Sequence, residues 1–148
     1  MNDSVDPRLD AIVGGLYRVA AKVLLVRDRK LLVVNETEKW YGVPGGGIEH
    51  GENLVEGMLR EVEEEIGLEL PLETISEKPI IISNAGVIHG IPRLTLYYTC
   101  TLPSDARLNI LQKELNSAWV TSSELLELPL GPNINEVKHE IARYIDSI

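Results

Sequence analysis

The 148-residue sequence contains no phenylalanine and only one cysteine, and aromatic residues make up 5% of it. A single cysteine cannot form an internal disulfide, so the fold must rely on a hydrophobic core. Since 44% of the residues are hydrophobic and 25% are charged, the composition is that of a globular protein, neither disordered nor fibrous. The length suits one domain, and we expect residues 1–148 to form it.

Long apolar runs and positive charge are also scarce. No run approaches the roughly 20 apolar residues that a membrane-spanning helix needs. The start, Met1 to Asp10, lacks the apolar segment of a signal peptide, so we predict a cytoplasmic protein with no membrane partner. The formal net charge of −9 argues against binding to nucleic-acid polymers. A small phosphorylated ligand can still bind if a divalent cation bridges the like charges.

Apolar and β-branched runs predict the strands, and the first two read as a hairpin. The predicted strands are residues 17–26, 31–34, 40–43, 79–88, 94–102 and 118–120, and residues 45–47 are a predicted glycine loop. Asn53 and Glu56 form a capping pattern for a helix that Gly67 ends. Thr121 to Glu124 can cap a short helix that continues to Leu128.

A final helix is predicted by a second capping pattern, Asn133 with Glu136, and by apolar residues that line one face, namely Ile134, Val137, Ile141 and Ile145. The order of strands, helix, strands and helix predicts a mixed sheet with helices packed on it.

The first helix carries three carboxylates on one face, beside its apolar stripe. Glu61, Glu64 and Glu65 are spaced i, i+3 and i+4. A solvated acidic face explains Glu56 and Glu63 but suits Glu61 and Glu65 poorly, because crowded carboxylates beside a core repel one another and lose hydration. Such a cluster of hard oxygen ligands favours Mg²⁺ or Mn²⁺ as a cofactor.

Glycines accompany this cluster. Gly57 lies in the helix, where it costs about 1 kcal/mol relative to alanine, and either it is a tolerated weak spot or the face must stay flat for a close approach. Gly45, Gly46 and Gly47 precede the helix, where backbone groups can meet phosphate or a cation, although many such triplets are only turns.

A longer pattern joins these features. Gly46 is followed after five residues by Glu52, and after seven more by Arg60-Glu61-Val62-Glu63-Glu64-Glu65-Ile66-Gly67-Leu68. This stretch resembles the Nudix box of the MutT-like Nudix hydrolase family at every specified position, a match expected by chance about once in a billion starting points.

The resemblance implies an α/β/α sandwich with a mixed β-sheet, and hydrolysis of a nucleoside diphosphate linked to another moiety. By position in the box, Glu61, Glu64 and Glu65 are similar to the metal ligands, together with the Gly45 carbonyl. Arg60 matches the arginine that orients a glutamate, and Glu52 matches a glutamate that pairs or binds near the metal. The helical wheel turns Arg60 outward, so its side chain would have to fold back toward Glu52 or Glu64.

Other site residues depart from the family pattern or lie outside the box. Tyr41 stands where many members have tryptophan, and we expect it to contact substrate with Gly45, Gly46 and Arg93. A late-loop glutamate supplied by many members is not fixed by the sequence, and Glu114 is our candidate. With Mg²⁺ present, a box glutamate or Glu114 would act as the general base.

Three other functions are alternatives to hydrolysis of a (deoxy)nucleoside triphosphate, the default substrate. A nucleotide sensor would not need the complete carboxylate set, and an isoprenoid diphosphate isomerase would need a catalytic cysteine, which Cys100, expected to be buried and inert, suits poorly. A structural interaction protein does not explain the box. Ile82 stands where ADP-ribose hydrolases have proline, although ADP-ribose or a nucleotide sugar stays an alternative substrate. A homodimer is possible, and the sequence does not fix the oligomeric state.

Overall fold

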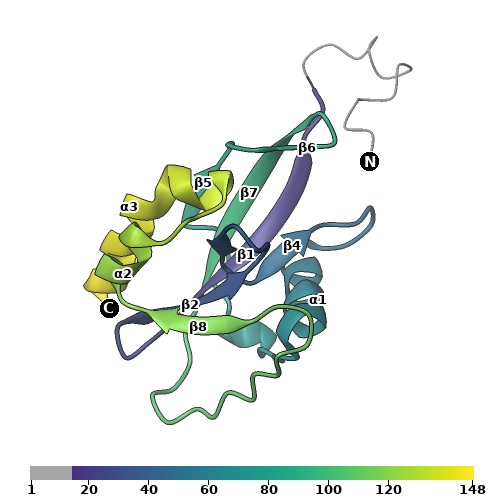
Figure 1. Cartoon of the computed structure of the whole chain (residues 1–148). Helices are drawn as coiled ribbons and strands as arrows, with labels where there is room; N and C mark the ends of the chain where they lie inside the picture. The colour runs from purple at the N-terminus through teal and green to yellow at the C-terminus, as the bar shows by residue number, and fades with distance from the viewer. Residues whose placement is uncertain (1–14) are drawn as a thin grey trace.

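A mixed β-sheet forms the centre of the protein in a computed structural model that describes residues 15–148 (Figure 1). Its strand β1 (Arg18–Arg27) runs parallel to β7 (Ile91–Cys100) and antiparallel to β2 (Lys30–Asn35). The shorter strands are β3 (Tyr41–Gly42), β4 (Gly45–Gly47), β5 (Ile81–Ser83), β6 (Val87–Ile88) and β8 (Ser117–Val120). The strand order is β3-β2-β1-β7-β5, while β4 pairs with β1, β6 with β7 and β8 with β2.

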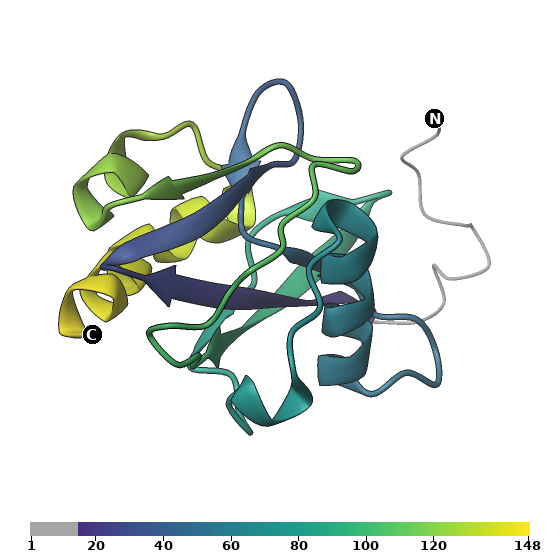
Figure 2. The same ribbon diagram turned by 90° about the horizontal axis from the view of Figure 1, so that it is seen from below.

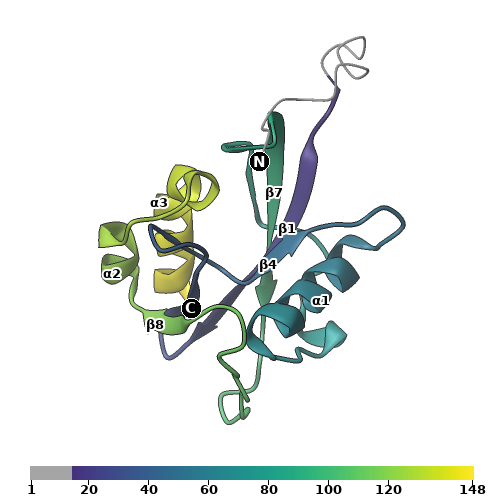
Figure 3. The same cartoon turned by 45° about the vertical axis from the view of Figure 1, so that its right-hand side comes forward.

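Helices cover both sides of this sheet, as Figure 3 shows. Helix α1 (Leu54–Ile66) lies on one side, and α2 (Ser122–Glu127) and α3 (Pro132–Ser147) lie on the other. Each side of the sheet has its own buried hydrophobic cluster. The cluster under α1 contains Met58, Val62 and Ile66, and the cluster under α3 contains Ile134, Val137, Ile141 and Ile145. Full burial of one such side chain contributes about 1.5–3 kcal/mol. The predicted α/β/α sandwich with a mixed sheet is therefore confirmed.

The strand predictions were correct for the first hairpin and wrong in two places. The hairpin forms with Val26 opposite Leu31. Residues 45–47, predicted as a loop, form β4 because their backbone pairs antiparallel with residues 20–22 of β1. The predicted strand over 79–88 divides into β5 and β6, since Gly86 has a positive φ of 96° and turns the chain.

The helix ends follow the sequence signals with one exception. Asn53 accepts hydrogen bonds from the backbone N–H groups of Val55 and Glu56, and Gly67 ends α1 in the left-handed conformation. Thr121 caps α2 with the complete capping box. Asn133, however, is not the cap, because Gly131 is the N-cap and α3 starts at Pro132, two residues earlier than predicted; the fixed φ of proline suits this first helical position. This shift places Asn133 inside the first turn, where it is buried.

Steric crowding explains why a glycine stands at position 57 inside the helix. A Cβ at Gly57 would lie 2.8 Å from Cδ1 of Ile48 and 3.0 Å from Oε1 of Glu52. The helix face stays flat, therefore, so that the segment between β4 and α1 can pack on it and hold the Glu52 carboxylate in place.

The segment between β7 and β8 passes beside α1, as Figure 2 shows. The N–H of Leu111 donates to the carbonyl of Ile66 at 2.6 Å, which ties this segment to the end of the helix. Cys100 is buried, and burial raises the pKa of its thiol, as expected for an inert cysteine. Between residues 15 and 148 no helix is long and apolar enough to cross a membrane. The signal-peptide prediction on Met1 to Asp10 and the first 14 residues of the predicted domain lie outside the described residues.

Candidate active site

Two glycines of β4, Gly45 and Gly46, lie in tight contact with their neighbours. Gly45 has a φ of 130°, and a Cβ there would lie 2.3 Å from the carbonyl oxygen of Ala21. A Cβ at Gly46 would lie 2.8 Å from Cδ and Oε2 of Glu61. The backbone of β4 therefore lies directly against the Glu61 carboxylate, which would have to move to admit a side chain at position 46.

Arg60 is the centre of a carboxylate network. Its Nε and Nη2 donate to Oε2 and Oε1 of Glu52 at 2.8 and 2.9 Å, a bidentate pair. Its Nη1 donates to Glu61 at 3.0 Å and to Glu64 at 3.1 Å, and Nη2 also reaches the Gly47 carbonyl at 3.3 Å. The long side chain thus folds back over the helix face, which resolves the conflict with the helical wheel.

This network fixes the charge of Glu52. The hydrogen bonds from Arg60, followed by the one from the Glu49 N–H, lower the pKa of Glu52 to about 2. The hydrogen bonds of Arg60 to Glu52, and then to Glu61 and Glu64, raise the pKa of its guanidinium, so it stays protonated. Glu52 is consequently a permanent anion that holds Arg60, and Arg60 in turn orients Glu61 and Glu64.

Glu65 lies in a different environment from the other box glutamates. Burial raises its pKa to about 7, and the nearby Glu61 and Glu36 carboxylates act in the same direction. The charge of Lys22 and a hydrogen bond of 3.4 Å from the Gly45 N–H offset only part of this effect. Glu65 is therefore a desolvated carboxylate whose charged form lacks a strong cationic partner, a chemistry that suits a metal ion.

Glu64 and Glu114 complete the predicted set. The Glu64 side chain is 53% exposed, so it can reach solvent or a ligand as well as Arg60. The backbone N–H of Glu114 donates to the carbonyl of Glu65 at 3.0 Å. The structure thus brings Glu114 next to the end of α1, with an exposed side chain.

The described part of the chain holds no group of three acidic, histidine or cysteine side chains already arranged around a metal position. Glu61 and Glu64 are both bonded to Arg60, whereas Glu65 turns toward Gly45. The donor set nevertheless fits a divalent cation, because Glu61, Glu64 and Glu65 share one helix face beside the Gly45 backbone and Glu65 is poorly neutralised.

A separate hollow of about 190 Å³ lies between the sheet and the start of α3. Its lining residues come from distant segments and are Glu36, Trp40, Gly86, Val87, Ile88, Arg93, Gly131, Pro132 and Asn133. We call it the α3-side pocket. It offers an aromatic ring, a guanidinium, a carboxylate and an amide, and Asn133 is only 5% exposed. This combination can bind a planar polar ring.

Lys22 connects the α3-side pocket to the carboxylates. It is 4% exposed, forms an ion pair with Glu36 and donates to the Val43 carbonyl at 3.3 Å. Its backbone lies opposite Gly45, and its charge lowers the pKa of Glu65. The buried Lys22 ammonium therefore anchors the backbone at Val43, just before β4, and also lowers the pKa of Glu65.

Among the predicted substrate residues, Arg93 lines the α3-side pocket but Tyr41 does not. Tyr41 packs against the α3-side core, and its backbone bonds Pro129 and Gly131. Trp40, which is 37% exposed, lines the pocket in its place. Sequence reasoning missed Trp40, Glu36, Lys22 and the place of Asn133 in the pocket lining. The available signal was Lys22, a single charge inside the apolar run of β1.

A family model and several solved structures match this chain. The family model described as NUDIX domain matches residues 16–141. The solved MutT protein from Methanosarcina mazei Go1 superposes with a TM-score of 0.66 at 17% identity, over 89% of this chain and 97% of that one. The mutator MutT protein from Bacillus halodurans gives a TM-score of 0.61 at 22% identity, over 86% and 82% of the two chains.

A C. elegans Ap4A hydrolase also superposes, with a TM-score of 0.66 at 14% identity over 88% of this chain and 99% of that one. No protein of curated function matches this sequence significantly. At these identities the structural matches establish the fold alone, and the family model, which spans most of the chain, establishes the family.

Proposed function

This chain belongs to the Nudix family of hydrolases, which act on phosphoanhydrides, and we propose that it cleaves a nucleoside diphosphate linked to another moiety with Mg²⁺ as the cofactor. One observation carries the proposal, which is that Gly46 lies against the Glu61 carboxylate while Gly45 bonds Glu65. A backbone strand and two carboxylates thus meet where a cation and a diphosphate can be held together.

The metal ligands in this proposal are Glu61, Glu64, Glu65 and the carbonyl of Gly45. When bound, Mg²⁺ would neutralise the diphosphate and lower the pKa of a coordinated water. The poorly neutralised Glu65 supports this set, because binding a cation would stabilise its charged form. Glu61 and Glu64 would exchange part of their bonding to Arg60 for the cation.

Arg60 and Glu52 would orient the ligands and would not react themselves. The bidentate Arg60–Glu52 pair anchors the guanidinium, which limits the positions that Glu61 and Glu64 can adopt. The proton of the attacking water would pass to a box glutamate or to Glu114. Glu114 is supported by its backbone bond to Glu65 and by its exposed side chain.

The nucleoside would bind in the α3-side pocket. Trp40 would stack on the base, Arg93 would contact a phosphate or the base, and Asn133 would bond the base edge. A (deoxy)nucleoside triphosphate is the default substrate, and Ap4A enters the test because the C. elegans neighbour is an Ap4A hydrolase.

The test is hydrolysis of a substrate panel with Mg²⁺ present or chelated. The panel contains nucleoside triphosphates, Ap4A, ADP-ribose, NADH and nucleotide sugars. We expect Mg²⁺-dependent release of a nucleoside monophosphate that Glu64→Gln abolishes, while the exposed Glu63→Gln on the same helix retains it. If nothing is cleaved and one nucleotide stabilises the protein without metal, the chain is a nucleotide sensor.

A further inference from the structure

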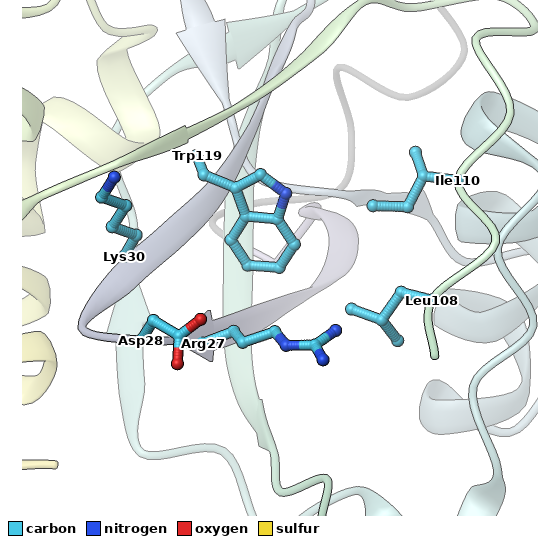
Figure 4. A pocket seen from close by; sticks show the side chains of 6 residues that line it. All are labelled: Arg27, Asp28, Lys30, Leu108, Ile110 and Trp119. Carbon is cyan, nitrogen blue, oxygen red and sulfur yellow. The ribbon is translucent and has the colours of Figure 1, made fainter. Parts of the chain in front are cut away.

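A second hollow, of about 350 Å³, lies at the other end of β1, between the β1–β2 hairpin, β8 and the segment 101–116. It is lined by Arg27, Asp28, Lys30, Leu108, Ile110 and Trp119 (Figure 4). We call it the Trp119 pocket. It shares no lining residue with the α3-side pocket and contains none of the proposed metal ligands.

The walls of the Trp119 pocket combine a flat apolar surface with hydrogen-bond donors. Leu108 and Ile110 lie opposite the indole ring, and Figure 4 shows the indole nitrogen directed toward Ile110. Arg27 extends beneath the ring, with its guanidinium toward Leu108. No hydrogen bond is made by the Trp119 side chain within residues 15–148, so its N–H is available to an acceptor.

The charges of the pocket favour an anion. Arg27 makes only one long hydrogen bond, 3.4 Å to the Ser104 carbonyl, and neither Arg27 nor Lys30 has an ion-pair partner among the described residues. Asp28 is the single carboxylate in the lining, against two cations. On a chain with a formal net charge of −9, the Arg27 guanidinium beneath the indole ring, which has no carboxylate partner among the described residues, forms a local site for negative charge.

The pocket is held in shape from both sides. Arg29, at the hairpin turn with a φ of 60°, donates to the Asp146 carbonyl at 3.1 Å and to the Ile148 carbonyl at 3.5 Å, which fixes the turn to the end of α3. On the opposite wall, Leu111 is bonded to Ile66, immediately after Ile110. The lining residues therefore face a defined space between two anchored segments.

We propose that the Trp119 pocket is a second ligand site, for a planar aromatic molecule that carries one anionic group. The ring would stack on the Trp119 indole between Leu108 and Ile110, and the anion would bond the Arg27 guanidinium and the indole N–H. Nucleoside monophosphates and aromatic carboxylates share this chemistry. The site does not depend on the proposed hydrolysis, and it is tested in metal-free protein.

Tryptophan fluorescence gives a reporter for each pocket, because the chain has two tryptophans. Trp40→Phe leaves only Trp119, and Trp119→Phe leaves only Trp40. Both proteins are titrated with AMP and with naphthalene-2-carboxylate in the presence of a chelator, which keeps phosphate from being held through a metal. We expect a saturable change of Trp119 fluorescence, with adenosine and inorganic phosphate, which each lack one half of the ligand, at least tenfold weaker.

Arg27→Gln in the Trp40→Phe background provides the decisive variant. It should weaken binding at least tenfold, whereas Arg143→Gln, which removes the same charge from an exposed position of α3, should leave binding unchanged. Binding of AMP alone identifies a nucleotide ligand, and binding of the naphthoate alone identifies an aromatic acid; both support the site. The proposal is overturned if Trp119 responds to neither probe, if Arg27→Gln binds as well as its parent, or if only Trp40 responds.

Discussion

The box region and the α3-side pocket are built in opposite ways. The box region takes Gly46, Glu52, Arg60, Glu61 and Glu65 from 20 consecutive residues, 46–65, and places them through one strand, one turn and one helix. The α3-side pocket takes Glu36, Trp40, Arg93 and Asn133 from segments that only the sheet topology brings together. A local motif can therefore specify the proposed catalytic residues, while the proposed substrate pocket depends on the whole fold.

The two regions also differ in how their charges are balanced. Around the box, the Arg60 guanidinium donates hydrogen bonds to Glu52, Glu61 and Glu64 but not to Glu65, whose pKa is raised by burial. On the other side of β4, Lys22 and Glu36 form a closed pair. In the proposed function, the poorly neutralised Glu65 would make the box region the one that binds a cation, and the α3-side pocket would bind the ring of the substrate.

The largest effect is expected at Glu61. Glu61→Gln removes a proposed ligand that contacts both Gly46 and Arg60, and a metal contributes several kcal/mol to the transition state, so kcat should fall about 10³-fold. Steady-state kinetics on the cleaved substrate measures this. Glu63→Gln, on the exposed face of the same helix, is the matched control and should keep its activity. Equal losses in both variants would exclude Glu61 from the metal site.

A smaller loss, in stability, is expected at Lys22, which belongs to both regions. Lys22→Met removes the cation of a buried pair and leaves Glu36, which is 21% exposed, without its partner, so the free energy of unfolding should drop by about 2 kcal/mol. Denaturant unfolding at neutral pH measures the loss. Lys78→Met, at an exposed position, should change stability by less than about 0.5 kcal/mol. If the two variants unfold alike, the Lys22–Glu36 pair does not hold β4.

The same contrast explains what the sequence could predict. The box, the caps at Asn53 and Gly67 and the apolar face of α3 are local patterns, and the structure has each of them. The α3-side pocket could not be predicted, because Arg93 and Asn133 line one pocket only through the register of β7 on β1 and through a helix start at Pro132. The β4 strand was missed for a related reason, since three glycines have little strand propensity and pair only because β1 offers a free edge there.

An effect on binding alone is expected at Asn133. Asn133→Ala removes a hydrogen bond to the base, typically about 1–1.5 kcal/mol, so KM should rise about tenfold while kcat changes less than about twofold. Asn135→Ala, at an exposed position in the same helical turn, should leave both constants unchanged. A fall in kcat at constant KM would instead place Asn133 in the chemical step and end the separation of the two regions.

The smallest effect is the response of the metal-free protein to pH. The folded-state pKa of Glu65 is about 7, above its ordinary value of 4.5, so the folded state holds this proton more tightly than the unfolded state. The resulting stability is complete below pH 4.5 and is lost as the pH rises through 7. Wild type should therefore lose about 1 kcal/mol between these values relative to Glu65→Gln, after allowance for partial exposure.

Saturating Mg²⁺ should remove this difference, because the cation takes the place of the proton on Glu65. Thermal unfolding of both proteins across this pH range, with and without Mg²⁺, distinguishes the outcomes. Parallel curves for wild type and Glu65→Gln without metal would mean that Glu65 titrates normally. The box would then carry no unbalanced carboxylate, and the contrast in charge between the two regions would be lost.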